Sequence, residues 1–211
     1  MKIYKKCDTI TYANINNSGE FMSKETDIFI KDRADPYVTI GDDGWYYFTA
    51  SYPMYGKDDK EGYDRIILRR AKTIDGLKTA EEKVIWDEKE SESSFRFIWA
   101  PELHTIGGKW YVLFAASGSE SNVWDINCHI IMCNGKDPYN DSWTDLGKFQ
   151  ACDGDGFSFT NFSLDMTYFE SGGVSYVAWA QNGGNSNVYI ATVDPEKPWK
   201  TTCKAVLLTK P

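Results

Sequence analysis

The sequence lacks any long apolar run. No window approaches the roughly 18 to 20 apolar residues that cross a bilayer, and the N-terminus MKIYKKCDTITYANINNS starts basic but has no apolar segment of a secretion signal. We therefore expect no membrane partner and a cytoplasmic location.

Basic charge is also scarce. The chain has 23 Lys and Arg against 31 Asp and Glu, a net charge of −8. Binding to a phosphate backbone relies on clustered Lys and Arg, whose contacts release counterions. Nucleic acid is therefore excluded as an expected partner.

Cysteines are too few and too scattered for a disulfide framework. Five stand at 7, 128, 133, 152 and 203, an odd set that fits reduced thiols in a cytosol. Cys128 and Cys133 lack the second Cys or His pair of a zinc site, and DGDG at 153–156 lacks the later Glu of a calcium loop. His104 and His129 stand alone and are predicted to be satisfied strand residues. The sequence predicts no protein metal site and no required cofactor.

Aromatic residues are abundant, with 8 Trp, 13 Tyr and 11 Phe. Their planar faces suit both β-sheet packing and stacking on sugars. Residues 37–40 alternate, an acidic Gly turn follows at 41–44, and WYYFTAS at 45–51 reads as the second strand of a hairpin. Two further strands are expected at 65–72 (RIILRRAK) and 83–87 (KVIWD), which complete a meander of four short strands.

The same unit recurs twice. An aromatic strand follows a Gly-Gly turn at 107–108 and again at 172–173. Aligning Asp35, Glu102 and Asp165 gives offsets of 67 and 63 residues. A period of about 65 residues with four strands per repeat is typical of β-propeller blades.

We therefore predict an all-β fold, a partial β-propeller forming one domain over residues 1–211. Its blades are expected at about 31–90, 98–155 and 160–211. Because a propeller closes with about four to eight blades, the three blades predict a chain shortened at its C-terminus, with exposed blade faces that favour self-association. A β-sandwich is the structural alternative.

Three motifs resemble those of a known family. In chain order they are RADPYV at 33–38, IWAPELH at 98–104 and FSLDMTYFE at 162–170. From about Lys31 onward the sequence resembles the family 43 glycoside hydrolases, and RIILRR at 65–70 with WAQ at 179–181 is most similar to their exo-acting α-L-arabinofuranosidases. The resemblance implies a five-bladed propeller that cleaves arabinofuranosides and xylosides with inversion.

Inversion requires a carboxylate base that activates water and, on the other face of the sugar, an acid that protonates the leaving oxygen. The resemblance implies that Asp35 is the general base and that Asp165 orients the acid and raises its pKa. Each aspartate also has a structural alternative. Asp35 can start a turn before Pro36, and Asp165 can be a partnered residue within an apolar alternation.

Three further residues are candidates for substrate binding. In the family, the Trp of the second motif lines the pocket of the terminal sugar, which implies this role for Trp99, with core packing as the alternative. Glu102 aligns with the two aspartates, and binding and structural support are both open for it. Tyr52 follows the first hairpin, where it either contacts sugar or packs on the surface.

The general acid of the family is a Glu in a Glu-Gly-Pro type motif downstream of the third-blade Asp. No Glu-Gly-Pro occurs in these 211 residues, so the chain is expected to be inactive or crippled on natural glycosides, whose leaving groups need protonation. Family members often hold a calcium ion in the channel, and the complete protein is expected to be able to do so.

Two classes of function remain. The first is a glycosidase that releases terminal α-L-arabinofuranose from arabinan- or arabinoxylan-derived oligosaccharides, with a β-xylosidase as the alternative. The second is a non-catalytic carbohydrate-binding propeller.

Overall fold

The computed structural model describes residues 28–54, 62–91, 96–119, 121–183 and 186–209. The chain divides into two compact units, residues 1–31 and residues 32–211. The expectation of one domain over residues 1–211 stays a prediction, since residues 1–27 lie outside the described residues. Every strand of the described residues lies in the second unit.

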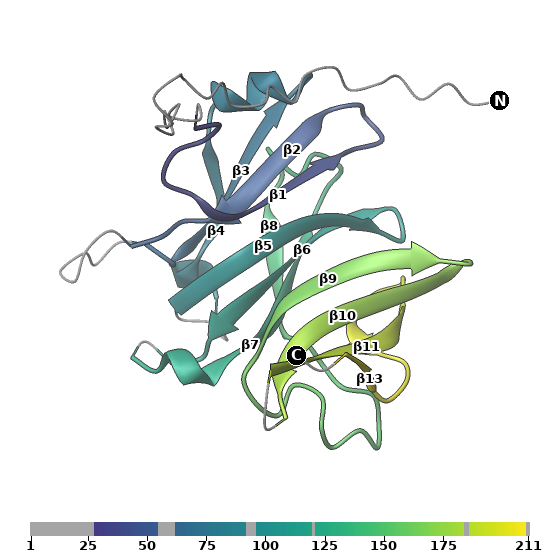
Figure 1. Cartoon of the computed structure of the whole chain (residues 1–211). Coiled ribbons are helices and arrows are strands. Elements are labelled where there is room, and N and C mark those ends of the chain that lie inside the picture. Colours follow the sequence, from purple (N-terminus) through teal and green to yellow (C-terminus); the bar gives the residue numbers. More distant parts are fainter. Residues whose placement is uncertain (1–27, 55–61, 92–95, 120, 184–185, 210–211) are drawn as a thin grey trace, which may run out of the picture. The chain divides into compact units, whose positions relative to one another are not determined.

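The strands form three antiparallel sheets, which correspond to three blades (Figure 1). Blade 1 contains β1 (Ala34–Ile40), β2 (Tyr46–Ser51), β3 (Arg65–Ala71) and β4 (Lys83–Asp87). Blade 2 contains β5 (Arg96–Ile106), β6 (Lys109–Ser117), β7 (Ile126–Cys133) and β8 (Trp143–Lys148). Blade 3 contains β9 (Ser163–Ser171), β10 (Val174–Asn182), β11 (Ser186–Asp194), β12 (Lys197–Thr201) and β13 (Val206–Thr209).

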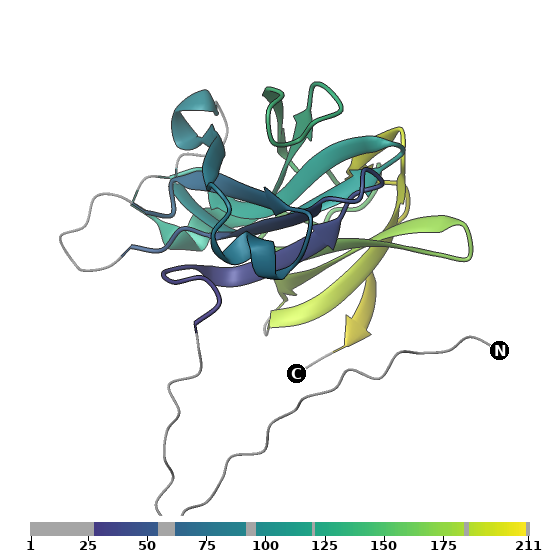
Figure 2. The same ribbon diagram turned by 90° about the horizontal axis from the view of Figure 1, so that it is seen from above.

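Within each blade the strands pair in chain order, and β13 adds to β11 of blade 3. Three short 3-10 helices lie outside the sheets, at Asp75–Lys78, Glu88–Glu90 and Val123–Asp125. The first strands of the blades are neighbours, because β5 contacts both β1 and β9, and Figure 2 shows the three blades from a second direction. The all-β prediction with about three propeller blades is confirmed.

Strand β6 explains how the blades pack together. Its sequence KWYVLFAAS is almost continuously apolar, as expected for a strand buried on both faces. Val112 and Phe114 join the core shared with blade 1, whereas Tyr111 and Leu113 point to the opposite face and join the core shared with blade 3. Blade 2 is therefore the central layer of the described fold.

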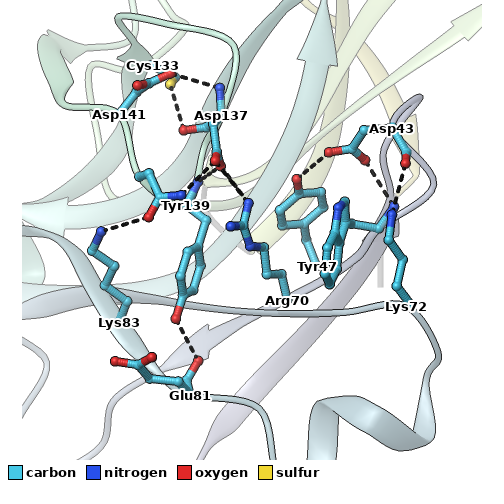
Figure 3. Close-up of polar contacts among 12 residues, drawn as sticks. Asp43, Tyr47, Arg70, Lys72, Glu81, Lys83, Cys133, Asp137, Tyr139 and Asp141 are labelled. Atoms are coloured by element: carbon cyan, nitrogen blue, oxygen red, sulfur yellow. Dashed lines mark hydrogen bonds and ion pairs between the residues drawn. The ribbon is translucent and has the colours of Figure 1, made fainter.

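Polar contacts also join blades 1 and 2 (Figure 3). The Arg70 guanidinium of β3 donates to both carboxylate oxygens of Asp137, at 2.9 and 3.0 Å, in the loop between β7 and β8. It also lies over the ring of Tyr139, 4.6 Å from the centroid. Asp137 accepts hydrogen bonds from Asn140 and from the Tyr139 backbone as well. Burial would raise the pKa of Asp137, but these donors and the charge of Arg70 hold it below its usual value.

Each first strand contains a β-bulge at a corresponding position. The pairing slips between Ala34 and Tyr37 in β1, between Trp99 and Glu102 in β5, and between Leu164 and Thr167 in β9. One residue in each bulge adopts a left-handed conformation, with φ of 48° at Asp35, 44° at Ala100 and 50° at Asp165. Such angles are uncommon outside glycine, and bulges often re-aim a side chain.

The bulges correct the alignment of the repeats. Asp35, Ala100 and Asp165 are equivalent, and each is 65 residues from the next. Glu102 instead corresponds to Tyr37 and Thr167, two residues beyond the position of the aspartates. The offsets of 67 and 63 expected from the sequence were therefore wrong by two residues.

Candidate active site

The charges of two carboxylates on other blades act on Asp165. Asp35 stands on β1, Glu102 on β5 and Asp165 on β9. Partial burial of its carboxyl group raises the pKa of Asp165 above the ordinary value, and the negative charges of Asp35 and Glu102 raise it further. Part of Asp165 is exposed to solvent, yet its carboxyl lies among like charges. This arrangement is common at functional sites.

Asp35 and Asp165 share a position in the repeat but have different surroundings. The Ser51 hydroxyl donates to Asp35 Oδ2 at 2.9 Å. Among the described residues, no side chain or backbone group donates a hydrogen bond to the Asp165 carboxylate. A hydroxyl therefore holds the Asp35 carboxylate, whereas the described surroundings of the Asp165 carboxylate act on it through burial and nearby charges.

Glu102 is held by a histidine. Its Oε2 lies 2.8 Å from His104 Nε2, while His104 Nδ1 lies 3.4 Å from the Tyr37 hydroxyl of blade 1. These contacts fit the tautomer in which Nε2–H donates to Glu102 and Nδ1 accepts from Tyr37. Burial raises the pKa of Tyr37 to about 12, with a further contribution from the charge of Glu102. His104 is thus a partnered strand residue, as the sequence predicted, and it also links blades 1 and 2.

Trp99 is half-buried beside the bulge of β5. Its indole packs edge-to-face on Tyr63, with ring centroids 5.7 Å apart, and on Phe97 at 6.2 Å. Its buried N–H has no hydrogen-bond partner among the described residues. The role of Trp99 in lining a sugar pocket stays a prediction.

The ring of Tyr52 is covered by two cations. The guanidinium groups of Arg33 and Arg65 lie 4.2 and 4.6 Å from its centroid. Cation–π contacts of this kind hold a ring in place and occupy surface that a sugar would need. This geometry favours the packing alternative for Tyr52, and its contact with substrate stays a prediction.

Arg33 also anchors the start of β1. Its guanidinium pairs with the Glu82 carboxylate through both Nε and Nη2, and Arg69 donates to the same carboxylate at 3.0 Å. Burial would raise the pKa of Glu82, but the two guanidinium groups outweigh it and hold the pKa below its usual value. The three side chains form a small ion-pair network. Because Arg33 lies two residues before Asp35, this network holds the chain in place at the start of β1.

The described residues were predicted to hold no metal or cofactor. Within residues 28–209, apart from the segments that the structure does not describe, no three His, Cys, Asp or Glu side chains gather closely enough to ligate a metal. Cys128, Cys133, Cys152 and Cys203 are free thiols, and Cys7 lies outside the described residues. None of the described helices has the length and apolar character needed to cross a bilayer.

Ser51 and Arg33 are site residues that sequence reasoning missed as such. Arg33 lies within the RADPYV motif, and its spacing to Asp35 indicates no partner. Ser51 ends an aromatic strand, where its hydroxyl could not be placed without the pairing of β1 with β2. Each residue is recognised as part of the site only by its contact with a residue 49 positions later in the chain: Arg33 with Glu82, and Ser51 with Ala100.

Comparisons with known proteins show which proteins the chain resembles. The chain is 39% identical over 184 residues to an extracellular exo-α-(1→5)-L-arabinofuranosidase of Streptomyces chartreusis, covering 86% of this chain and 52% of that protein. It is 40% identical over 187 residues to α-L-arabinofuranosidase 43 of Humicola insolens, covering 86% and 35%. The chain therefore spans about half or less of the length of these relatives.

Solved structures give the same result. An α-L-arabinofuranosidase from Lactobacillus brevis matches with a TM-score of 0.74 and 38% identity, over 88% of this chain and 56% of that one. An endo-arabinase from Bacteroides thetaiotaomicron, at 16% identity, shares the fold with a TM-score of 0.60, over 84% and 56%. The model of the glycosyl hydrolases family 43 matches residues 27–210, and the chain belongs to that family.

Proposed function

We propose that this protein is an inverting glycoside hydrolase that releases terminal α-L-arabinofuranose from arabinan- or arabinoxylan-derived oligosaccharides. The observation that carries the proposal is the placement of Asp35, Glu102 and Asp165 on the neighbouring first strands of three blades, where the charges of Asp35 and Glu102 help to raise the pKa of Asp165. The arabinofuranosidase names of the relatives, at 38% to 40% identity, support the choice of sugar.

Asp35 acts as the general base. An inverting base takes a proton from water as the water attacks the anomeric carbon, and the base and acid carboxyls stand about 6.5 to 9.5 Å apart to leave room for that water. Ser51 donates to Oδ2 of Asp35, and among the described residues nothing donates to Oδ1. Oδ1 is therefore the oxygen that takes the proton.

Asp165 acts through its charge. A carboxylate whose own pKa is raised by Asp35 and Glu102 raises in turn the pKa of an acidic group placed beside it. In this role Asp165 keeps the proton donor protonated until the leaving oxygen needs it.

We further propose that the proton donor is not among these 211 residues, because the Glu-Gly-Pro motif is absent from them. Without that donor, an alkoxide leaving group departs slowly, whereas a nitrophenolate leaves without protonation. The chain is then expected to hydrolyse 4-nitrophenyl α-L-arabinofuranoside but to act poorly on arabino-oligosaccharides.

The test compares the chain with its Asp35→Ala and Asp165→Ala variants on this aryl substrate, with proton NMR of the first-formed arabinose anomer. We expect inversion and a loss of about a hundredfold to ten-thousandfold in turnover for Asp35→Ala. Faster hydrolysis of the aryl β-D-xyloside would favour a β-xylosidase. Sugar binding without turnover in the unmodified chain would instead indicate a binding propeller. Hydrolysis of arabino-oligosaccharides as fast as by a full-length relative would refute the proposal about the acid.

A further inference from the structure

We propose that Ser51 is a positioning residue: its hydroxyl fixes the carboxylate of Asp35 and ties it to the backbone of blade 2. The inference rests on the proposed function for the role of Asp35, but the contact itself can be tested without turnover. It concerns a serine that neither the motifs nor the comparisons single out.

The hydrogen bonds of Ser51 leave its hydroxyl one orientation. Ser51 is fully buried at the end of β2. Its Oγ accepts from the backbone N–H of Ala100 at 2.8 Å and donates to Asp35 Oδ2 at 2.9 Å. Because an amide N–H can only donate and a carboxylate can only accept, the hydroxyl proton must point at Asp35.

Among the described residues, no group other than the Ser51 hydroxyl donates a hydrogen bond to the Asp35 carboxylate. Asp35 is exposed and lies in a bulge, in a left-handed conformation with φ of 48°. Strained backbone of this kind persists where surrounding contacts determine it. Ser51 supplies such a contact from the buried core, so it restricts the carboxylate more than a surface donor would.

The second partner of Ser51 connects the base to the next blade. Ala100 occupies the place of Asp35 in β5, between Trp99 and Glu102, the two candidates for substrate binding on that strand. One hydroxyl therefore sets the distance between the proposed base and the proposed sugar-binding segment. A shift of this distance would misplace the attacking water relative to the anomeric carbon, and such misplacement is costly in rate.

The repeats show that this hydroxyl is particular to blade 1. Ser51 pairs with Ala34, directly before Asp35. The corresponding residues are Ala115 opposite Trp99 in blade 2 and Ala180 opposite Leu164 in blade 3. Neither alanine side chain carries a donor, so Asp165 lacks the hydroxyl that donates to Asp35. Asp35 and Asp165 therefore occupy the same position in the repeat but differ in their surroundings, because only Asp35 receives a hydrogen bond from a hydroxyl on the neighbouring strand.

The experiment uses Ser51→Ala, Ser51→Thr and the matched control Ser117→Ala, with 4-nitrophenyl α-L-arabinofuranoside as substrate. Ser117 is also fully buried at the end of its strand, β6, but its hydroxyl donates to the Asn122 backbone. Hydrogen bonds to charged groups predict that Ser51→Ala lowers kcat about ten- to hundredfold while KM changes less than about twofold. Ser51→Thr retains the hydroxyl and should recover most of kcat, and Ser117→Ala should leave it unchanged.

Two readouts separate positioning from general stability. In the Asp35→Ala background, adding Ser51→Ala should not lower turnover further, because the residue acts through Asp35. By NMR, Ser51→Ala should shift the carboxyl carbon signal of Asp35 and speed amide exchange at Ala100 by at least about tenfold, whereas Ser117→Ala should change neither.

The outcomes distinguish this inference from the proposed function. If the unmodified chain shows no turnover, the proposed function fails, and the Asp35 signal and Ala100 exchange still decide whether Ser51 holds both partners. An unchanged kcat in Ser51→Ala, a Ser51→Thr variant as slow as Ser51→Ala, or unaltered NMR readouts would each overturn the inference.

Discussion

The ion pair at the entry to β1 permits a quantitative prediction. Glu82 accepts from both Arg33 and Arg69, and the three side chains are 17%, 12% and 16% exposed. Glu82→Gln would leave two largely buried guanidinium groups without a counter-charge. Breaking a fully buried pair costs about 3 to 5 kcal/mol, and the residual solvent contact lowers this to about 2 to 3 kcal/mol of unfolding free energy at pH 7.

The effect should depend on pH in a defined direction. The folded-state pKa of Glu82 lies below the ordinary 4.5, so the unfolded chain takes up its proton first as the pH falls. The stabilisation by ionised Glu82 is therefore fully present above about pH 4.5 and is lost as the pH falls through the lower, folded-state pKa. The difference between the unmodified chain and Glu82→Gln should shrink accordingly.

The assay is urea unfolding at pH 7 and at pH 3, with Glu81→Gln as control. Glu81 is exposed and receives only a backbone contact, from the Tyr139 hydroxyl, so its variant should stay within about 0.5 kcal/mol of the unmodified chain. The reasoning would be refuted if Glu82→Gln matched Glu81→Gln at pH 7, or if its deficit were equally large at pH 3.

Three further predictions concern stability and association. Asp165→Asn removes a charge that its surroundings disfavour, so Tm at pH 7 should rise by about 1 to 2 °C and the gain should vanish near pH 3, where Asp165 is protonated; a lower Tm at pH 7 would contradict this. Trp86→Ala should cost about 3 to 5 kcal/mol in urea unfolding, because Trp86 is buried against Phe114 of blade 2, and a loss under 1 kcal/mol would argue against a shared core. Leu208→Lys on the exposed apolar strand β13 should reduce self-association in sedimentation velocity, and unchanged association would exclude this strand as the contact.

Local sequence patterns determined the strands and their grouping. The aromatic runs after the turns at 41–44, 107–108 and 172–173 became β2, β6 and β10, because alternation and turn chemistry act over a few residues. The three motifs were also sufficient for the family. The roles of Asp35 and Asp165 stay predictions, although the structure brings Asp165 within reach of the charges of Asp35 and Glu102.

The equivalence of the blades was decided only by tertiary structure. By sequence, FTAS at 48–51 looks like FAAS at 114–117. Aligning these segments would make Ser51 equivalent to Ser117 and would align Asp35 with the residue next to Glu102. The bulges shift the register, so that Ala115 corresponds to Ser51 and Ala100 to Asp35. Register depends on hydrogen bonds to a partner strand and on which face is buried, and neither is visible in a local pattern.

The partners of the site residues were likewise beyond the sequence. Ser51 meets Ala100, and Arg33 meets Glu82, across 49 positions of the chain. Serine, arginine and glutamate are common surface residues. Only the folded chain, in which β1 pairs with β2 and contacts β5, partly or fully buries these side chains and makes their pairing necessary. The sequence alone determined which groups carry the proposed chemistry, whereas the tertiary structure decided what holds them in place.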